Sequence, residues 1–242
     1  MVLVLFQLLY YKRHSSVKQC ILIIMIVKVK ISPYESKPVS SDPIKYLSNI
    51  DAQLAGVIKA VGQYSIKVYD NAFQSLVESI IFQQLAGTAA TAIYGKFIKY
   101  YNEVMPTPIQ ILSSPDTELK SKVGLSSKKI EYLKDLSSRI EDGRLNLNSL
   151  PSMTDEEVIS TLQQVKGIGR WTAEMFLIFC LGRLDVLPVT DLGIRKAMQK
   201  IYSLPELPKP ATMLAIAQPW KPYRSIATWY LWKSLSKFTS IG

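Results

Sequence analysis

The chain has 242 residues, and 48% of them are hydrophobic, so a packed globular fold of one large domain or two small ones is expected. Lys and Arg number 29 against 19 acidic residues, a net charge of +10, which favours a polyanionic partner. A ribosome-associated or membrane-surface protein would fit the same charge. The two cysteines, Cys20 and Cys180, exclude a four-cysteine zinc or iron–sulfur site within the chain. We expect a reducing compartment, the cytoplasm or, in a eukaryote, the nucleus.

The first 40 residues differ from the rest. Two apolar runs, Met1–Tyr10 and Cys20–Val27, are separated by charged residues. Each is shorter than the roughly 18 to 20 residues of a membrane span, and the order of charges does not fit a signal peptide, so we expect no membrane contact. We expect residues 1–40 to be a poorly ordered or non-native extension, with Met25 as a candidate for the true start. A strand over Ile21–Ile31 is the alternative, because β-branched residues are frequent there.

From residue 42 onward, hydrophobic residues recur at helical spacing. The pair Asp42-Pro43 predicts a cap and a first helical position, for a helix that runs to about Gly62. A second helix begins near Asn71, and its high apolar content predicts a central position. A third covers Ile93–Tyr101 and ends before two closely spaced prolines.

The second half of the chain continues this pattern. Ser126 opens a helix after a glycine turn, and Thr154 with Glu157 predicts a capping box for another. Further helices are predicted from about Asp191 to Tyr202 and through Ala211–Phe238. Because strand signals are nearly absent after residue 40, the sequence predicts an all-α protein.

Two of these helical segments are joined by a glycine hairpin. Gly167 and Gly169, separated by one residue, permit positive φ angles and the close approach of another molecule. The first turn of the following helix leaves backbone N–H groups free for an anion, which predicts sequence-independent binding of DNA phosphate. An ordinary helix–helix turn is the alternative. The candidate DNA contacts are Lys166, Gly167, Ile168, Gly169, Arg170 and, through its hydroxyl, Thr172.

One acidic residue follows this hairpin by about a helix length. Asp191 comes after Leu-Pro-Val-Thr and opens a helix. From spacing alone, an N-terminal cap that complements the helix dipole is a sufficient interpretation.

Several motifs together resemble a known family. The segment Leu162–Ala173 is similar to the helix-hairpin-helix of the base-excision DNA glycosylase superfamily, and Leu187–Asp191 resembles the loop that ends in its catalytic aspartate. Three further segments, Ser79–Leu85, Gly124–Leu133 and Trp220–Trp232, resemble the alkylation-repair branch, 3-methyladenine DNA glycosylase II. The resemblance covers about Asp42 to Phe238. The sequence departs from the family pattern in two ways. It lacks a full N-terminal β domain, and it lacks the four C-terminal cysteines of iron–sulfur members.

The resemblance implies roles for individual residues. Asp191 would stabilise the sugar cation or assist water, and an alkylated purine, already cationic, departs without a second acid. Trp171 occupies the position of the lysine that forms a Schiff base in bifunctional members, which implies hydrolysis without strand cleavage. Its indole would border the base pocket through cation–π attraction. Burial of Trp171 between helices is the alternative.

Duplex DNA requires the nucleotide to be flipped out and the gap to be filled. The resemblance assigns this to Gln84 and Leu85, with a purely structural helix end as the alternative. Trp220 and Arg224 are weaker pocket candidates within an aromatic-rich C-terminal cluster.

The expected architecture is two helical subdomains, about 70–205 and about 42–65 plus 206–240, with DNA in the cleft between them. The implied activity is hydrolysis of alkylated bases, chiefly 3-methyladenine and also 7-methylguanine or 1-methyladenine, in double-stranded DNA by a monomer without cofactor or metal. A glycosylase for another lesion, with or without lyase activity, and a non-catalytic damaged-DNA-binding protein remain as alternatives.

Overall fold

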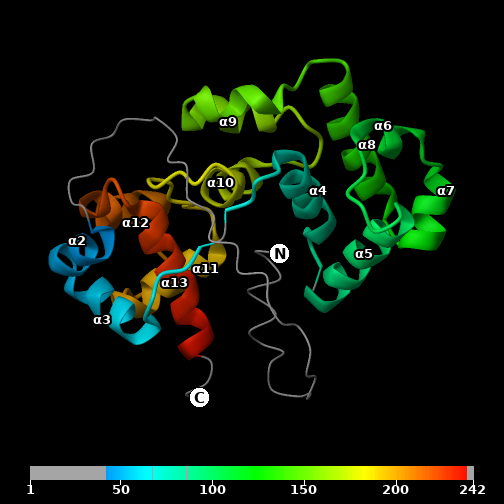
Figure 1. Ribbon diagram of the computed structural model, residues 1–242. Coiled ribbons are helices and arrows are strands. Elements are labelled where there is room, and N and C mark those ends of the chain that lie inside the picture. The colour runs from blue at the N-terminus through cyan, green and yellow to red at the C-terminus, as the bar shows by residue number, and fades with distance from the viewer. Residues whose placement is uncertain (1–41, 67, 86, 239–242) are drawn as a thin grey trace.

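The computed structural model describes residues 42–66, 68–85 and 87–238, and its regular structure there is helical, with no strand in these ranges (Figure 1). The prediction of an all-α protein is therefore confirmed. The expected extension 1–40 and the alternative strand Ile21–Ile31 lie outside the described residues. No helix in the described ranges is long and apolar enough to cross a membrane.

The helices form two groups (Figure 1). One group combines both ends of the described chain, because α13 packs against α2, α3 and α11. Its members are α2 (Pro43–Ile50), α3 (Ala52–Val61), α11 (Leu192–Ile201), α12 (Pro210–Ala217), η3 (Gln218–Trp220) and α13 (Arg224–Phe238).

The other group, drawn in green on the right of Figure 1, is continuous in sequence. In it α4 packs against α5 and α8, and α6 against α8. Its members are α4 (Ala72–Phe82), α5 (Gly87–Tyr100), α6 (Pro108–Ser113), α7 (Asp116–Glu118), η1 (Leu119–Val123) and α8 (Ser127–Glu141).

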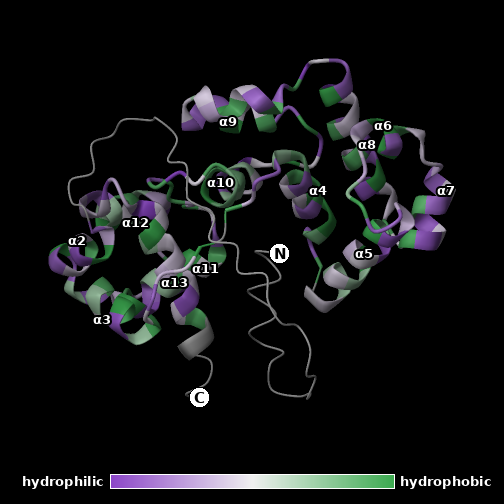
Figure 2. Ribbon diagram, in the orientation of Figure 1, coloured by the Kyte–Doolittle hydropathy of each residue, from purple (hydrophilic) through white to green (hydrophobic). Residues whose placement is uncertain are grey.

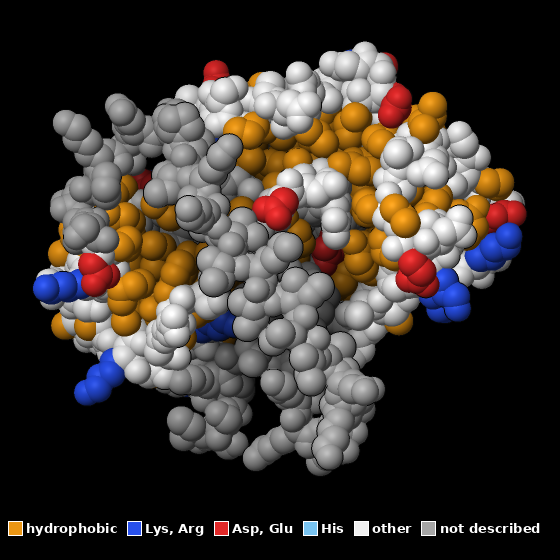
Figure 3. Space-filling model, viewed as in Figure 1, with side chains coloured by type: hydrophobic (Ala, Val, Ile, Leu, Met, Phe, Trp, Pro, Cys, Tyr) orange, Lys and Arg blue, Asp and Glu red, His pale blue; other side chains and the backbone are white. Residues whose placement is uncertain are grey.

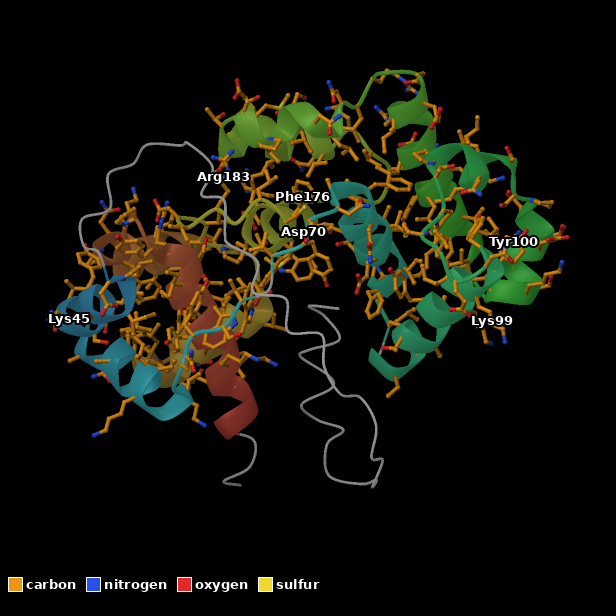
Figure 4. The ribbon with its side chains drawn as sticks, viewed as in Figure 1. Lys45, Asp70, Lys99, Tyr100, Phe176 and Arg183 are labelled. Atoms are coloured by element: carbon orange, nitrogen blue, oxygen red, sulfur yellow. The ribbon has the colours of Figure 1, made fainter. Side chains whose placement is uncertain are left out.

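Between the two groups lies α10 (Arg170–Phe179), which packs against α4 and against α9 (Asp155–Leu162). Much of α10 is hydrophobic (Figure 2), and its residues Ala173, Phe176 and Leu177 are buried. The short η2 (Leu147–Ser152) precedes α9. Arg183, which follows α10, donates to the carbonyls of Pro151 and Met153 at 2.9 and 2.8 Å (Figure 4). These bonds join the segment that leads from η2 into α9 to the end of α10.

Local capping explains where these helices begin. Asn71, Ser126 and Asp191 each accept a backbone N–H bond from the first turn of α4, α8 and α11, and Thr154 with Glu157 forms the predicted capping box of α9. The α5 helix begins at Gly87, earlier than the predicted Ile93.

Two expectations from the sequence are wrong. The single helix predicted from Asp42 to Gly62 is divided at Asp51, which is extended (φ −141°) and caps α3 through a bond from the Leu54 N–H. The Asp51 carboxylate also accepts bonds from Tyr202 and Trp220, so distant partners stabilise the break. In addition, α11 packs on α13 within the group of terminal helices, whereas the expected boundary near residue 205 placed it in the other subdomain.

Hydrophobic side chains also reach the surface. On the face shown in Figure 3 they gather near α9 and α4, and the visible Lys and Arg side chains stand mostly toward the two ends. A pocket of about 510 Å³ opens beside η2 and the C-terminal end of α10, where Asp70 and Cys180 contribute to its wall. Figure 4 draws Asp70 and Phe176 at the centre of the molecule, between the two groups.

Candidate active site

The carboxylate of Asp191 lies where three helices meet. Its Oδ1 accepts the backbone N–H of Ile194 at 2.7 Å and the indole N–H of Trp232 at 3.0 Å. Its Oδ2 accepts the indole N–H of Trp171 at 2.7 Å. Trp171 belongs to α10, Ile194 to α11 and Trp232 to α13, so the three donors orient the carboxylate from separate elements.

Asp191 is 9% exposed, so most of its surface is covered by these partners. Hydrogen bonds to a charged acceptor are worth about 1.5 to 3 kcal/mol each, enough to hold a single orientation. The predicted cap and the candidate catalytic group are the same side chain, because one oxygen closes the α11 N-terminus while the other faces the Trp171 indole.

Gly193 leaves the space that this arrangement needs. A Cβ atom added there would lie 3.0 Å from Asp191 Oδ1 and 3.4 Å from a ring carbon of Trp232. Such a contact is tighter than ordinary van der Waals packing and would push on the carboxylate or the indole. A glycine at this position therefore allows both groups to approach the backbone of α11.

The glycine hairpin lies at the start of α10. Gly167 has φ +80°, and a Cβ there would collide with the Tyr132 ring, so only glycine fits. Gly169 caps α10 with an ordinary φ of −93°, and a Cβ there would meet open space. The positive φ angle that glycine permits is therefore adopted by Gly167 and not by Gly169.

The N-terminus of α10 is available to an anion. No side chain caps it, and the N–H groups of Arg170, Trp171 and Thr172 donate to no residue that the structure describes. Gly169 and Arg170 are exposed, so another molecule can reach these groups.

The two basic residues of the hairpin are paired with carboxylates. Lys166 Nζ lies 2.7 Å from Glu131. Arg170 lies 2.5 Å from Glu156 and 3.1 Å from Glu174, and its hydrogen bonds to Glu156 raise the pKa of the guanidinium. A phosphate would compete with these pairs, of which the exposed Glu156 is the easiest to displace.

Burial of the Glu174 side chain raises the pKa of its carboxyl, and Asp191 adds to this shift by repulsion, although Arg170 opposes it. The second oxygen of Glu174 has no hydrogen-bond partner among the described residues.

Two other predicted contacts face inward. Ile168 is 4% exposed and Thr172 is 6% exposed. Both side chains serve packing, which disfavours the expected contact of the Thr172 hydroxyl with DNA and leaves the backbone of these residues as the candidate contact.

The structure brings the Gln83-Gln84-Leu85 turn next to the hairpin. The Gln83 side-chain amide donates to the carbonyl oxygen of Gly167 at 2.8 Å. Gln84 is exposed and adopts φ +56°, a left-handed conformation that is uncommon for a residue other than glycine. Leu85 is partly buried. The two segments expected to touch DNA are therefore neighbours, although they are far apart in sequence.

The two weaker pocket candidates, Trp220 and Arg224, each bind an acidic side chain of the fold. Trp220 is fully buried and donates its indole N–H to Asp51 at 2.8 Å, so it has no surface to offer a base. Arg224 is engaged with Asp185 at 2.6 Å. This pair anchors the segment that leads to Asp191, and the adjacent Ser225 accepts the Val186 N–H at 2.9 Å.

Trp232 was not among the residues predicted to form the site, although it lies in the aromatic-rich C-terminal cluster. It is 5% exposed and stacks on Phe179 at 5.8 Å between ring centroids. The sequence carries no local signal for the hydrogen bond between Trp232 and Asp191, because the hydrophobic pattern of α13 would be the same for any buried tryptophan. Among the described residues, no cluster of three His, Cys, Asp or Glu side chains is placed to hold a metal ion.

Comparison with known proteins identifies a family for this chain. The family described as HhH-GPD superfamily base excision DNA repair protein matches residues 77–222. DNA-3-methyladenine glycosylase 1 of Schizosaccharomyces pombe is 35% identical over 195 residues, which cover 78% of this chain and 85% of that protein.

Two solved structures are also similar. A DNA-3-methyladenine glycosidase from Bacillus halodurans has a TM-score of 0.74 and 36% identity, with 83% of this chain and 92% of that chain covered. The S. pombe 3-methyladenine DNA glycosylase in complex with abasic DNA has a TM-score of 0.72 and 34% identity, with 79% and 95% covered. The chain therefore belongs to the HhH-GPD superfamily of base excision DNA repair proteins.

Proposed function

We propose that this protein is a monofunctional DNA glycosylase that hydrolyses the N-glycosidic bond of alkylated bases in duplex DNA and leaves an abasic site. The substrates are chiefly 3-methyladenine, with 7-methylguanine and 1-methyladenine as further candidates. The observation that carries the proposal is the Asp191 carboxylate, oriented by the indoles of Trp171 and Trp232 beside an open helix N-terminus. The names of the two similar proteins described above, from S. pombe and B. halodurans, support the same substrate class.

In this mechanism the carboxylate faces the sugar. An N-alkylated purine carries positive charge, so the bond to the sugar breaks without a general acid, and positive charge develops at the anomeric carbon. A fixed anion stabilises that charge in the transition state and also orients the water that attacks it. One carboxylate is sufficient, in contrast to the pair used by most sugar hydrolases.

Trp171 supports hydrolysis without strand cleavage. It occupies the hairpin position at which bifunctional relatives carry the lysine nucleophile, and its indole N–H is committed to Asp191. Lys166 is the neighbouring amine, and its Nζ pairs with Glu131 rather than with Asp191. Trp171 is partly exposed, and its indole suits a cationic base through cation–π attraction.

DNA would be held at two neighbouring places. Phosphate would accept from the uncapped N–H groups of α10, with added charge from Lys166 and Arg170 once their carboxylate partners are displaced. Gln84, exposed at its turn, would enter the stack where the flipped nucleotide was. We expect the protein to act as a monomer where the genome is held, the cytoplasm or, in a eukaryote, the nucleus.

The test is chromatography of the bases released from methylated DNA. We expect release of 3-methyladenine by the unmodified protein and a loss of at least about 100-fold for Asp191→Asn, the size observed when one transition-state-stabilising group is removed. Binding of Asp191→Asn to duplex DNA at reduced salt should remain.

Two outcomes would contradict the proposal. If the unmodified protein releases no base, it acts only as a DNA-binding protein. If borohydride traps a covalent complex with DNA, the enzyme is bifunctional. The spectrum of released bases separates alkylated lesions from an oxidised or mismatched substrate.

A further inference from the structure

Lys129 lies in the first turn of α8, and its ammonium group binds the end of another helix. Its Nζ donates to the carbonyl oxygens of Ile80 at 3.0 Å, Ile81 at 2.6 Å and Gln83 at 2.8 Å. The side chain is partly buried, and its ammonium forms no ion pair with a carboxylate of the described residues. Three carbonyl dipoles therefore take the place of a counter-ion.

These carbonyls belong to the last turn of α4 and to the residue that ends it. The last carbonyls of a helix have no partner within the helix and need one from outside. At Gln83 the backbone leaves the helix (ψ 134°), and Gln84 follows with φ +56°. A left-handed residue that is not glycine costs about 1 kcal/mol or more, so its surroundings must stabilise it. Lys129 is the charged group bound to the carbonyls that directly precede this residue.

The same helix also supports the hairpin. The Tyr132 ring of α8 lies against Gly167, and Asp135 of α8 accepts the backbone N–H of Lys166 at 2.9 Å. The hydrogen bond from the Gln83 side-chain amide to the Gly167 carbonyl joins the hairpin directly to the turn. Residues 129, 132 and 135 are spaced at one helical turn, so one face of α8 supports both segments.

We propose that Lys129 is a positioning residue that fixes the Gln84 turn in the conformation that enters the DNA stack. The inference rests on the proposed function, since it assumes that Gln84 fills the space of the flipped nucleotide. Lys129 acts through the backbone of residues 80–83 and touches neither the base nor Asp191. Its removal should impair flipping without removing the phosphate contacts of the hairpin.

The experiment compares Lys129→Met with Lys129→Arg and with Lys122→Met, an equal charge loss at an exposed lysine of η1. A duplex with 2-aminopurine next to the lesion reports unstacking by its fluorescence. For Lys129→Met we expect this fluorescence rise to be lost and the single-turnover rate of base release to fall roughly 10-fold or more, as for loss of charged hydrogen bonds. Affinity for undamaged duplex DNA should stay within about twofold. Lys122→Met should behave as wild type.

Lys129→Arg keeps the charge and part of the hydrogen bonding, so it should recover part of the fluorescence change. A structural role alone would not give this separation of flipping from binding. A double-mutant cycle adds a second readout: in a Gln84→Ala background, Lys129→Met should cause no further loss, because the two residues act in one step.

Wild-type fluorescence and rate for Lys129→Met would overturn the inference, and so would a full additional loss in the Gln84→Ala background. Lys129→Met is replaced if its thermal transition shows that it does not fold. In that case a double-mutant cycle of Lys129→Arg and Gln84→Ala tests whether the two residues act in one step. If the wild type unstacks the lesion but releases no base, the proposed chemistry fails while the role of Lys129 is still tested by fluorescence.

Discussion

The indole N–H of Trp232 lies 3.0 Å from Oδ1 of Asp191, a residue 41 positions earlier in the chain. The same oxygen accepts the Ile194 N–H, so α13 and the first turn of α11 both donate hydrogen bonds to one carboxylate oxygen. The orientation of the candidate catalytic carboxylate thus depends on the packing of the C-terminal helix.

We expect Trp232→Phe to reduce the rate of base release by about 10- to 100-fold, because one hydrogen bond to a charged group, worth about 1.5 to 3 kcal/mol, is lost. The measurement is single-turnover release from methylated DNA. Trp229→Phe is the matched control, since Trp229 is a buried tryptophan of the same helix whose ring packs on Tyr64. Equal losses for the two variants would mean that packing of α13, and not the bond to Asp191, matters.

The two hairpin glycines should respond differently to alanine. Gly167→Ala places a methyl group in the Tyr132 ring at φ +80°, so we expect a lower midpoint of thermal unfolding and weaker DNA binding. Gly169→Ala has open space and an ordinary φ, so its midpoint should stay near that of the wild type. If DNA phosphate approaches this backbone, Gly169→Ala should still weaken duplex binding. Unchanged affinity for Gly169→Ala would count against the phosphate contact.

Glu156 competes with DNA for Arg170. We expect Glu156→Gln to tighten binding to duplex DNA by up to about fivefold, because an exposed ion pair is worth up to about 1 kcal/mol. The gain should shrink as salt is added. Glu206→Gln makes the same change of net charge at an exposed residue outside the hairpin. An equal gain for Glu206→Gln would show that net charge alone, and not release of Arg170, raises the affinity.

Burial lowers the pKa of Lys129 from 10.5 to about 8. Between these values the unfolded chain binds more protons than the folded protein at this site, so its contribution to the free energy of unfolding rises with pH. We therefore expect the wild type to gain stability relative to Lys129→Met as pH increases from about 8 toward 10. Urea unfolding of both proteins over this range measures the difference. A constant difference would show that the ammonium is not desolvated.

Much of the fold could be predicted because the signals are local. The caps at Asn71, Ser126 and Asp191 depend on a side chain and the backbone three residues later. The hairpin and its neighbouring acid were likewise visible as contiguous motifs. The break at Asp51 was not predicted, because the hydrophobic pattern continues through it and its partners Tyr202 and Trp220 are 151 and 169 residues away.

The candidate site divides in the same way. The helical class, the place of Asp191 at a helix start, and a glycine hairpin followed by a helix with a tryptophan in its first turn could all be inferred from local sequence patterns. Three contacts appear only once the helices are packed together: Trp171 and Trp232 share the Asp191 carboxylate, Lys129 binds the Gln83 carbonyl, and Trp220 lies in the core. Periodicity and capping act over a few residues of one chain segment, whereas these contacts join helices whose relative placement comes from burial of the whole core.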